Sequence, residues 1–457
     1  MVVLDLNCEI YFPIDSLFIP YGDNFIVFSN TNFTFVLVDQ KGKDLLQSCS
    51  GKLTFLETCQ IQSKLSTSSL EKSLVQVNSF VQQLLDSRFV SLNEPSESTR
   101  LSNLPQTGKA SRFCYIDLTN HCNLNCIYCY NADERRRNMA SSAKELTDDE
   151  IAGLLIKLKE NGFECIVFTG GEPLLRKNIF QLAKLVQNLG MQAALLTNGT
   201  LITQGIAKKI ATSFNSIIVS LDSCVKEEHE LQRGKGTFVR ILKGLEYLAT
   251  AGRVEISVRS VITKNNIDNL YKLPSFVHDR FNCRNLQPTF YLPNSLTEMI
   301  CLQLLPDLEI YRVGMSRFSD ALREVPGVTD KDHEPPILAG KCGAGKSIFS
   351  ISNVGDLYPC QALHFDRFLL GNIRIHRFED IFSGNNPKSN LIPTVFDVPV
   401  CQSCNLAVIC GGGCRAAAYS LYSDLFAHNK ALCGYFRTDA CNSLVKEFLC
   451  QTDGNIH

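Results

Sequence analysis

The middle of the sequence alternates between short apolar runs and longer amphipathic stretches. The amphipathic stretches carry apolar residues at helical spacing, whereas the apolar runs have the length and composition of buried strands. Five such runs follow one another: CYIDLT, CIVFTG, AALLTN, SIIVSLD and VEISVRSVIT. Repeated strand–helix units predict an α/β fold with a parallel sheet or barrel, from residue 112 to about 290. Folds of this kind place their functional residues at the carboxyl ends of the strands.

The region before this unit has a different pattern. Residues 1–92 contain three strand-like runs, CEIYFPID, NFIVFSN and FTFVLVDQ, followed by helical spacing that continues through LVQVNSFVQQLLDSRFV. This order predicts a separate winged-helix-like α+β domain. Residues 93–111 are rich in Ser, Pro, Asn and Thr without periodicity, so we interpret them as a linker.

The composition is that of a soluble globular protein, with 45% hydrophobic and 20% charged residues. A formal net charge of -1 favours neither nucleic acid nor an anionic membrane as a partner. No apolar run reaches the ~20 residues of a membrane span. The amino terminus also lacks the basic leader of a signal peptide. We therefore expect a cytoplasmic protein.

The 20 cysteines are unusual for a cytoplasmic chain. A reducing compartment disfavours disulfides, so dense cysteines there indicate metal or redox chemistry. Cys122, Cys126 and Cys129 follow the first strand with the spacing C-x3-C-x2-C. Thiolates are soft ligands that suit iron–sulfur clusters, and three of them would leave the fourth iron of a cubane open. A structural zinc site would normally have four protein ligands, which makes zinc the weaker alternative.

The run CNLNCIYCY resembles the signature of the radical S-adenosylmethionine (SAM) superfamily. The resemblance implies a partial (β/α)6 TIM barrel over residues 112–312 and a [4Fe–4S] cluster held by the three cysteines. In that family the open iron binds SAM, and an electron from the cluster cleaves it to methionine and a 5′-deoxyadenosyl radical. That radical abstracts a hydrogen atom from the substrate. Tyr128 would pack near the adenine.

Residues at the ends of later strands resemble the family's SAM-binding positions. TGGEP resembles the GGEP motif, in which the carboxylate holds the methionine amine and glycines allow close backbone approach. Ser220 and Arg233 would hold the SAM carboxylate. The complete set that the resemblance implies is Tyr128, Gly170, Gly171, Glu172, Asn198, Ser220, Asp222 and Arg233. A turn-cap role for Asp222 remains an alternative, and we interpret His229 as structural.

One position departs from the family. Ser223 stands where related sequences usually have glycine, which leaves the geometry of that turn open.

The carboxyl-terminal region, residues 313–457, resembles the SPASM extension, which carries two auxiliary iron–sulfur clusters. Its motif is CQSCNLAVICGGGC, preceded by SIFSISNVGDLYPC, which we interpret as a hairpin that turns at Gly355. Carried over by position, one cluster would be held by Cys401, Cys404, Cys410 and Cys433. The other would be held by Cys342, Cys360 and Cys414.

The second of these groups lacks one cysteine of the family pattern. HEPPILAGK, the stretch before Cys342, contains none. The resemblance therefore implies an open iron, a different ligand or a lower nuclearity. Cys283 and Cys301 are distant candidates for the missing ligand, and Cys441 is a rival of Cys433.

The amino-terminal region resembles the PqqD-like domain that recognises leader peptides in ribosomal peptide maturation. In that domain a groove between the third strand and the last helix takes up the leader as an extra strand. The resemblance implies a precursor peptide as partner. It also implies a reducing electron donor such as flavodoxin or ferredoxin.

We therefore expect a radical SAM/SPASM maturase that modifies a ribosomally made precursor peptide, most simply by a thioether or carbon–carbon crosslink. Two other interpretations stay open. In one, the same chemistry serves a protein side chain, as in sulfatase maturation, or a tetrapyrrole. A non-enzymatic chain would be an iron–sulfur electron carrier or a peptide-binding scaffold.

Overall fold

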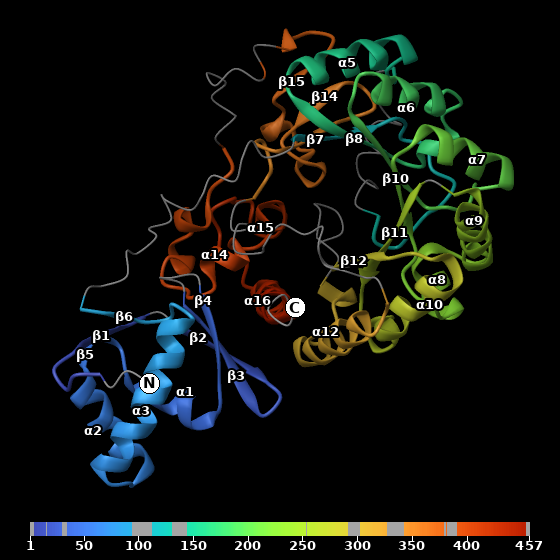
Figure 1. The fold of residues 1–457 in the computed structure, drawn as a ribbon. Coiled ribbons are helices and arrows are strands. Elements are labelled where there is room, and N and C mark those ends of the chain that lie inside the picture. Colours follow the sequence, from blue (N-terminus) through green and yellow to red (C-terminus); the bar gives the residue numbers. More distant parts are fainter. Residues whose placement is uncertain are drawn as a thin grey trace.

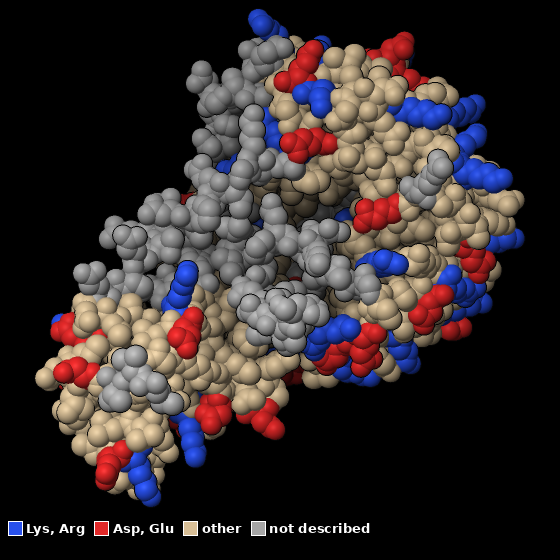
Figure 2. All heavy atoms as spheres, viewed as in Figure 1, with Lys and Arg blue, Asp and Glu red and all other residues tan. Residues whose placement is uncertain are grey.

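The computed structural model comprises three regions that follow one another along the chain (Figure 1). The described residues are 4–14, 16–29, 34–93, 112–129, 144–252, 254–290, 302–326, 342–378, 381 and 391–453. None of the helices within these ranges has the length and apolar character needed to cross a bilayer. Basic and acidic side chains alternate over the outer helices in Figure 2, as the near-zero net charge leads one to expect.

A nine-stranded sheet forms the central region, in the order β12-β11-β10-β9-β8-β7-β13-β14-β15. Six strands that follow one another in sequence pair in parallel. They are β7 (Arg112–Asp117), β8 (Phe163–Thr169), β9 (Gln192–Thr197), β10 (Ser216–Ser220), β11 (Glu255–Ile262) and β12 (Asn285–Phe290). Parallel strands that are covered on both faces are apolar throughout, which explains the runs in the sequence. The predicted α/β architecture is confirmed.

Helices follow the strands and cover the outer side of the sheet (Figure 1). They are α5 (Asp148–Glu160), α6 (Ile179–Asn188), α7 (Gln204–Ser213), α8 (Lys226–Arg233), α9 (Thr237–Ala251), α10 (Leu273–Phe281) and α12 (Leu308–Arg323). The expected capping box is present at the start of α5. Thr147 Oγ1 accepts from the amide of Glu150, and the Glu150 carboxylate accepts from the amide of Thr147. This reciprocal pair fixes where α5 begins, close to the carboxyl edge of the sheet.

The carboxyl-terminal region adds strands to the same sheet. Its hairpin, β13 (Ile348–Ile351) and β14 (Asp356–Tyr358), turns at Gly355 as predicted, with a φ of 93°. β13 pairs in parallel with β7. β14 then pairs with β15 (Gly371–Asn372). The barrel and the cysteine-rich region therefore share a continuous hydrogen-bonded sheet.

Two ionic and polar contacts hold this hairpin against the barrel. Asn353 Nδ2 donates to Glu145 Oε1 at 3.1 Å. Arg374 forms a two-pronged ion pair with Glu150, whose oxygens lie 2.6 and 2.8 Å from Nε and Nη2. Arg374 thus pulls the pKa of Glu150 down to about 2.

The amino-terminal region forms two small sheets and three helices. Its elements are β1 (Glu9–Phe12), β2 (Ser16–Tyr21), β3 (Asn24–Ser29), β4 (Thr34–Val38), α1 (Gln40–Ser48), β5 (Gly51–Thr54), α2 (Phe55–Ser66), α3 (Leu70–Asp86) and β6 (Ser91–Leu92). The sheets have the orders β2-β3-β4 and β5-β1-β6. The sequence correctly predicts β1, β3, β4 and the helices. The predicted group of three strands is wrong, because it contains β1 in place of β2. β1 pairs in the other sheet.

SLFIPY, the run that completes the first sheet, contains Pro20, which lacks an amide donor and argues against a central strand. It becomes β2 because this strand lies at the edge of the sheet and a tight turn at Gly22 folds it back onto β3. Gly22 has a φ of 57°, a left-handed conformation that glycine adopts without strain.

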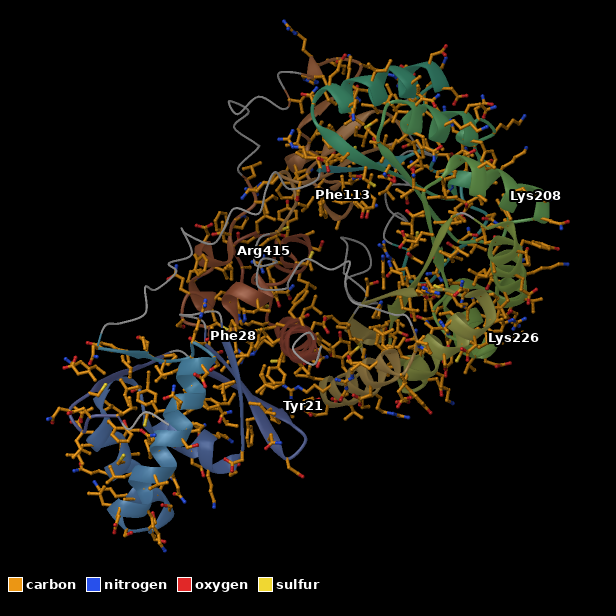
Figure 3. The ribbon with its side chains drawn as sticks, viewed as in Figure 1. Tyr21, Phe28, Phe113, Lys208, Lys226 and Arg415 are labelled. Atoms are coloured by element: carbon orange, nitrogen blue, oxygen red, sulfur yellow. The ribbon has the colours of Figure 1, made fainter. Side chains whose placement is uncertain are left out.

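The β2-β3-β4 sheet is covered on both faces. One face, with Val27, Val36 and Val38, packs on helices of its own region. The other face packs on α14 (Ala407–Cys410) and α16 (Cys433–Asp453) of the cysteine-rich region. The apolar residues at this junction are Leu17, Ile19, Ile26, Phe28, Phe35, Leu406, Ile409, Ala440, Leu444 and Phe448. Figure 3 labels Phe28 at this junction. The amino-terminal region is therefore docked on the cysteine-rich region rather than tethered by a linker alone.

Candidate functional site

The three closely spaced cysteines follow β7, at the carboxyl edge of the parallel strands. Cys122, Cys126 and Cys129 are each half-buried. Their thiols lie close enough to affect one another: burial raises the pKa of Cys126 to about 11, and Cys129 and Cys122 add to the rise. A cubane has its irons on separate corners, so the thiolates that hold it do not converge on one point. Among the described residues no group of three or more His, Cys, Asp or Glu converges tightly enough for a single ion.

Gly170 and Gly171 lock the end of β8 onto the stretch that leads into Cys122. The Gly171 amide donates to Thr119 O at 2.7 Å, and the next amide in the chain donates to His121 O at 2.8 Å. A Cβ on Gly170 would lie 2.4 Å from Thr119 O, and one on Gly171 would lie 2.1 Å from His121 O. No side chain fits at that distance, so glycine is required for this close backbone approach.

Glu172 is completely buried at the next position. It accepts from Thr197 Oγ1 at 2.7 Å, from the Asn198 amide at 2.9 Å and from the Leu174 amide at 3.1 Å. Burial raises the pKa of Glu172 to about 6, and these hydrogen bonds limit the rise. The Glu172 carboxylate therefore links the end of β8 to the end of β9.

Asn198 extends this connection to the cysteine loop. Its Nδ2 donates to Asn123 Oδ1 at 2.9 Å and lies 4.0 Å from Cys122 Sγ. Glu172 and Asn198, which the sequence placed at one site, thus lie together beside the first cysteine.

Asp222 is the centre of a second buried network, just beyond the end of β10. Its carboxylate accepts from Arg233 Nε at 2.7 Å, Arg233 Nη2 at 3.1 Å, the Val261 amide at 3.0 Å and the Tyr128 hydroxyl. These four bonds occupy its acceptor sites. Burial pushes the pKa of Asp222 upward, but the charge of Arg233 outweighs it and holds that pKa below its usual value. Their bonds to Asp222 fix both Arg233 and Tyr128. The guanidinium carbon of Arg233 lies 5.4 Å from the centroid of the Tyr128 ring.

His229 contacts the same network through the main chain of Asp222. Its Nδ1 accepts from the Asp222 amide at 3.2 Å. Burial lowers the pKa of His229 to about 4, so the ring is neutral at pH 7. The position that departs from the family is also accommodated. Ser223 is not among the residues with positive φ, and its hydroxyl donates to Glu228 and accepts from the Val225 amide at 3.0 Å. Ser220 ends β10, half-buried, and is aligned with Arg259 on β11.

No sequence motif singles out Asn120 and Gln232. Both side-chain amides are buried without a hydrogen-bond partner among the described residues. Asn120 lies two positions before Cys122, and the main-chain carbonyl of Gln232 accepts from the Ile127 amide at 3.0 Å. Buried amides are normally paired, so these two fit a polar ligand next to the cysteine loop.

Four of the carboxyl-terminal cysteines meet at one small cavity. It is lined by Cys401, Cys404, Ala407, Cys410, Gly412, His428, Asn429, Cys433, Phe436 and Arg437. Burial raises the pKa of Cys410 to about 11, with smaller contributions from its three cysteine neighbours. Cys441 is not part of this lining. It packs with Cys404 against the amino-terminal sheet instead.

Cys342, Cys360 and Cys414 form a separate group in apolar surroundings that include Leu363 and Phe368. Burial raises the pKa of Cys360, and the other two thiols add to the rise. Cys283, one candidate for a missing fourth ligand, lies in the barrel core before β12, where its thiol donates to Ile256 O at 3.2 Å. The other candidate, Cys301, lies outside the described residues.

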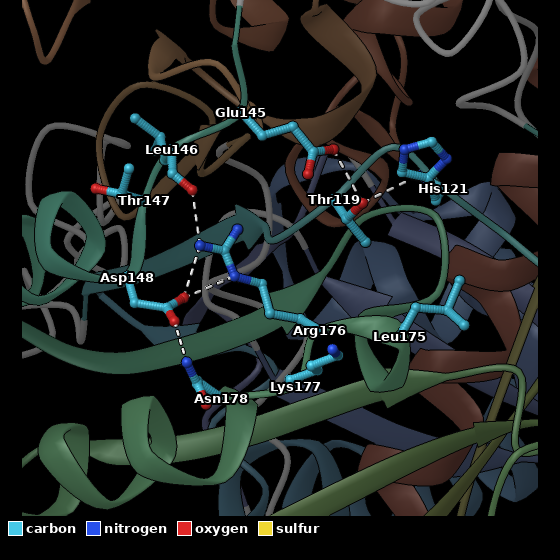
Figure 4. A pocket seen from close by; sticks show the side chains of 10 residues that line it. All are labelled: Thr119, His121, Glu145, Leu146, Thr147, Asp148, Leu175, Arg176, Lys177 and Asn178. Carbon is cyan, nitrogen blue, oxygen red and sulfur yellow. Dashed lines mark hydrogen bonds and ion pairs between the residues drawn. The ribbon is translucent and has the colours of Figure 1, made fainter.

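A cavity of about 590 Å³ lies beside Thr119 and His121, in the segment that leads into Cys122 (Figure 4). It is lined by Thr119, His121, Glu145, Leu146, Thr147, Asp148, Leu175, Arg176, Lys177 and Asn178. Arg176 donates to Asp148 Oδ1 at 2.7 Å, to Leu146 O at 2.7 Å and to Leu118 O at 2.8 Å. These bonds join three loops at the carboxyl edge, so we assign Arg176 to the support of the cysteine loop.

Two family models match this chain. The model of the radical SAM superfamily matches residues 116–273, and that of the iron–sulfur cluster-binding SPASM domain matches residues 342–405. The chain therefore contains a radical SAM domain followed by a SPASM domain. It is an enzyme whose cofactors are a [4Fe–4S] cluster that binds SAM and auxiliary iron–sulfur clusters.

Relatives by sequence fall into more than one functional group. The chain is 27% identical to the AdoMet-dependent heme synthase of Methanosarcina barkeri over 340 residues, which is 69% of this chain and 94% of the relative. It is also 27% identical to the mycofactocin maturase MftC of Mycolicibacterium smegmatis over 323 residues, 66% of this chain and 78% of the relative.

Two solved structures share the fold. Native anSMEcpe with bound AdoMet has a TM-score of 0.58 at 20% identity, with 76% of this chain and 100% of that chain covered. Streptococcus suis SuiB bound to S-adenosylmethionine has a TM-score of 0.56 at 18% identity, with 92% of this chain and 99% of that chain covered. The match to SuiB covers 92% of the chain and therefore includes much of residues 1–92. The match to anSMEcpe covers 76%, which is short enough to leave residues 1–92 out.

Proposed function

We propose that this protein is a maturase that uses radical SAM chemistry to modify a ribosomally made precursor peptide. The observation that carries the proposal is the amino-terminal sheet, whose β4 edge is unpaired among the described strands and whose face is docked on the cysteine-rich region. The fold likeness to SuiB, which has also been solved with its precursor peptide SuiA bound, supports it. So does the sequence similarity to mycofactocin maturase MftC.

The β4 edge suits an extended leader peptide. Gln83 on α3 donates weakly to Leu37 O at 3.4 Å, so α3 borders this edge. An incoming strand would replace that contact with main-chain hydrogen bonds, and pockets along α3 would select its side chains. The faces of the sheet are already covered, which leaves the edge as the surface for an added strand.

The residues around the cysteine loop fit the cofactor that the family implies. Cys122, Cys126 and Cys129 would hold the cluster, which with SAM supplies a 5′-deoxyadenosyl radical for hydrogen abstraction. Glu172 offers a carboxylate for the methionine amine. Arg233, with Nη1 still free of Asp222, offers a guanidinium for the methionine carboxylate, beside Ser220.

Two groups of carboxyl-terminal cysteines would hold the auxiliary clusters. Cys401, Cys404, Cys410 and Cys433 supply a complete set of thiols, whereas the group of Cys342, Cys360 and Cys414 supplies three. Clusters of this kind accept or deliver single electrons. They fit a reaction that leaves one electron on the peptide, such as thioether or carbon–carbon bond formation. An electron donor such as flavodoxin or ferredoxin would reduce the enzyme.

The test is anaerobic incubation of reduced, reconstituted enzyme with SAM and the precursor peptide encoded next to its gene. We expect 5′-deoxyadenosine together with a mass change in the core of the peptide. A precursor without its leader should react poorly. Cleavage of SAM with no change in peptide mass, under conditions in which the peptide binds, would contradict the proposal.

A second candidate is supported by a specific observation, the similarity to AdoMet-dependent heme synthase. A tetrapyrrole substrate would need no leader-binding edge. Replacement of Leu37 on β4 by proline removes an amide from the open edge, on the side where Leu37 O meets Gln83 of α3, and should abolish modification of a leader-dependent peptide. Tetrapyrrole turnover would survive that change, so the same variant separates the two candidates.

A further inference from the structure

One face of α16 carries three residues of chemical interest. Cys433, Arg437 and Cys441 are spaced four residues apart, so they lie above one another on the same side of the helix. Arg437 Nη1 donates to Cys404 Sγ at 3.5 Å. Arg437 also lines the cavity at which the four cysteines meet. The positive charge of this exposed arginine therefore lies against a sulfur of this group.

The charge of Arg437 is not neutralised nearby. Within the part of the chain that the structure describes, no carboxylate lies at ion-pair distance from its guanidinium.

We propose that Arg437 sets the reduction potential of the cluster that Cys401, Cys404, Cys410 and Cys433 hold. This inference rests on the proposed function, because that function assigns a cluster to the four cysteines. Reduction adds one electron to the cluster and makes its sulfurs more negative. A guanidinium that donates to one of them stabilises the reduced state more than the oxidised state, so the potential rises.

The consequence concerns the direction of electron flow. A higher potential makes this cluster a better acceptor for the electron that remains on a peptide after hydrogen abstraction and bond formation. The electron enters the cluster and leaves to an oxidised one-electron carrier such as flavodoxin or ferredoxin, which is reduced by it, and no proton is taken up at Arg437. The position of this arginine therefore marks the four-cysteine group, rather than the group of Cys342, as the electron sink.

The test is a reductive titration of the full chain followed by electron paramagnetic resonance. The background carries Cys122, Cys126 and Cys129 replaced by alanine, which removes the signal of the first cluster. Arg437→Gln should make reduction of one remaining cluster about tenfold less favourable, a shift of 59 mV for a one-electron couple. Arg437→Lys keeps the charge but loses the planar fork, and its shift should be smaller.

Arg312→Gln is the matched control. Arg312 is a half-exposed arginine on the neighbouring helix α12 whose charge acts on Cys441, but it is paired with Glu309 at 2.5 Å and donates to no sulfur of the described side chains. Its loss should leave the potential close to that of the parent. An unmoved potential in Arg437→Gln, or an equal shift in Arg312→Gln, would overturn the inference.

Iron and sulfide analysis distinguishes this failure from failure of the proposed function. Full iron content with an unmoved potential refutes the role of Arg437 alone. If replacement of Cys401 and Cys404 by alanine removes no iron from the parent, the four-cysteine group holds no cluster. The role of Arg437 and the assignment of an auxiliary cluster to these cysteines then both fall.

Discussion

The hydroxyl of Tyr128 donates to Oδ2 of Asp222, across 94 residues of sequence. Tyr128 lies between the second and third cysteines of the loop, whereas Asp222 lies after β10 and is paired with Arg233. The bond therefore ties the cysteine loop to the far half of the sheet. Asp222 therefore positions Tyr128 and Arg233 and binds no ligand itself, because protein donors fill its acceptor sites.

Loss of the Asp222 carboxylate should destabilise the barrel strongly. Asp222→Asn leaves the buried guanidinium of Arg233 without its counter-charge, at a cost of about 3–5 kcal/mol. Tyr128→Phe removes only one hydrogen bond to a charged group, worth about 1.5–3 kcal/mol. Anaerobic thermal unfolding should rank the two variants in that order. Equal stability of Asp222→Asn and the parent would show that the buried pair is unimportant.

Gly171→Ala should displace the cysteine loop. Its Cβ would lie 2.1 Å from His121 O, which is backbone and has no room to move aside. We expect less iron after reconstitution and weaker SAM binding, measured by iron analysis and by equilibrium dialysis. Gly153→Ala is the control, because Gly153 lies in α5 with open space around its Cβ position. Alanine there should stabilise the helix by about 0.5–1 kcal/mol. A normal iron content in Gly171→Ala would contradict the prediction.

The state of Glu172 should make SAM binding depend on pH. Its pKa is raised to about 6 by burial, so the folded protein holds this proton over a range in which the unfolded chain has released it. The contribution of Glu172 to stability is therefore present below its usual pKa of 4.5 and is lost as the pH rises through about 6.

Attraction of an ammonium group requires the ionised carboxylate. SAM affinity should then fall as the pH drops below about 6, by up to tenfold for each further pH unit. Calorimetric titration across this range measures it. Glu172→Gln should bind SAM weakly at every pH, and a parent-like pH profile in that variant would assign the effect to another group.

The junction between the amino-terminal sheet and α16 should be needed for a stable whole. The rings of Phe35 on β4 and Phe448 on α16 lie 6.4 Å apart, and both are buried. Phe448→Ala should cost about 3–5 kcal/mol and expose residues 1–92 to limited proteolysis. Val75→Ala, at a side chain that is 71% exposed on α3, should change stability by less than about 0.5 kcal/mol. Parent-like resistance to protease in Phe448→Ala would argue that the two regions dock independently of this contact.

The sequence by itself determined the parts of this protein that depend on local pattern. Apolar runs of strand length predicted all the parallel strands but the last, and the capping residues of α5 predicted its start. The run that holds Cys122, Cys126 and Cys129 identified the family by resemblance, because these three cysteines are close in sequence and form a recognisable motif. β2 was not predicted, because a proline such as Pro20 generally argues against a strand. Pro20 is tolerated only because β2 lies at the edge of its sheet.

Only the tertiary structure decided which distant segments meet. β13 pairs with β14 on one side, and on the other side it joins β7, which makes one sheet of the barrel and the hairpin. The contacts of Tyr128 with Asp222 and of Arg437 with Cys404 also have no signature in the sequence. Helical and strand periodicities fix which face of an element is apolar. The partner of that face depends on complementary shape and burial across the whole fold, which no local pattern records.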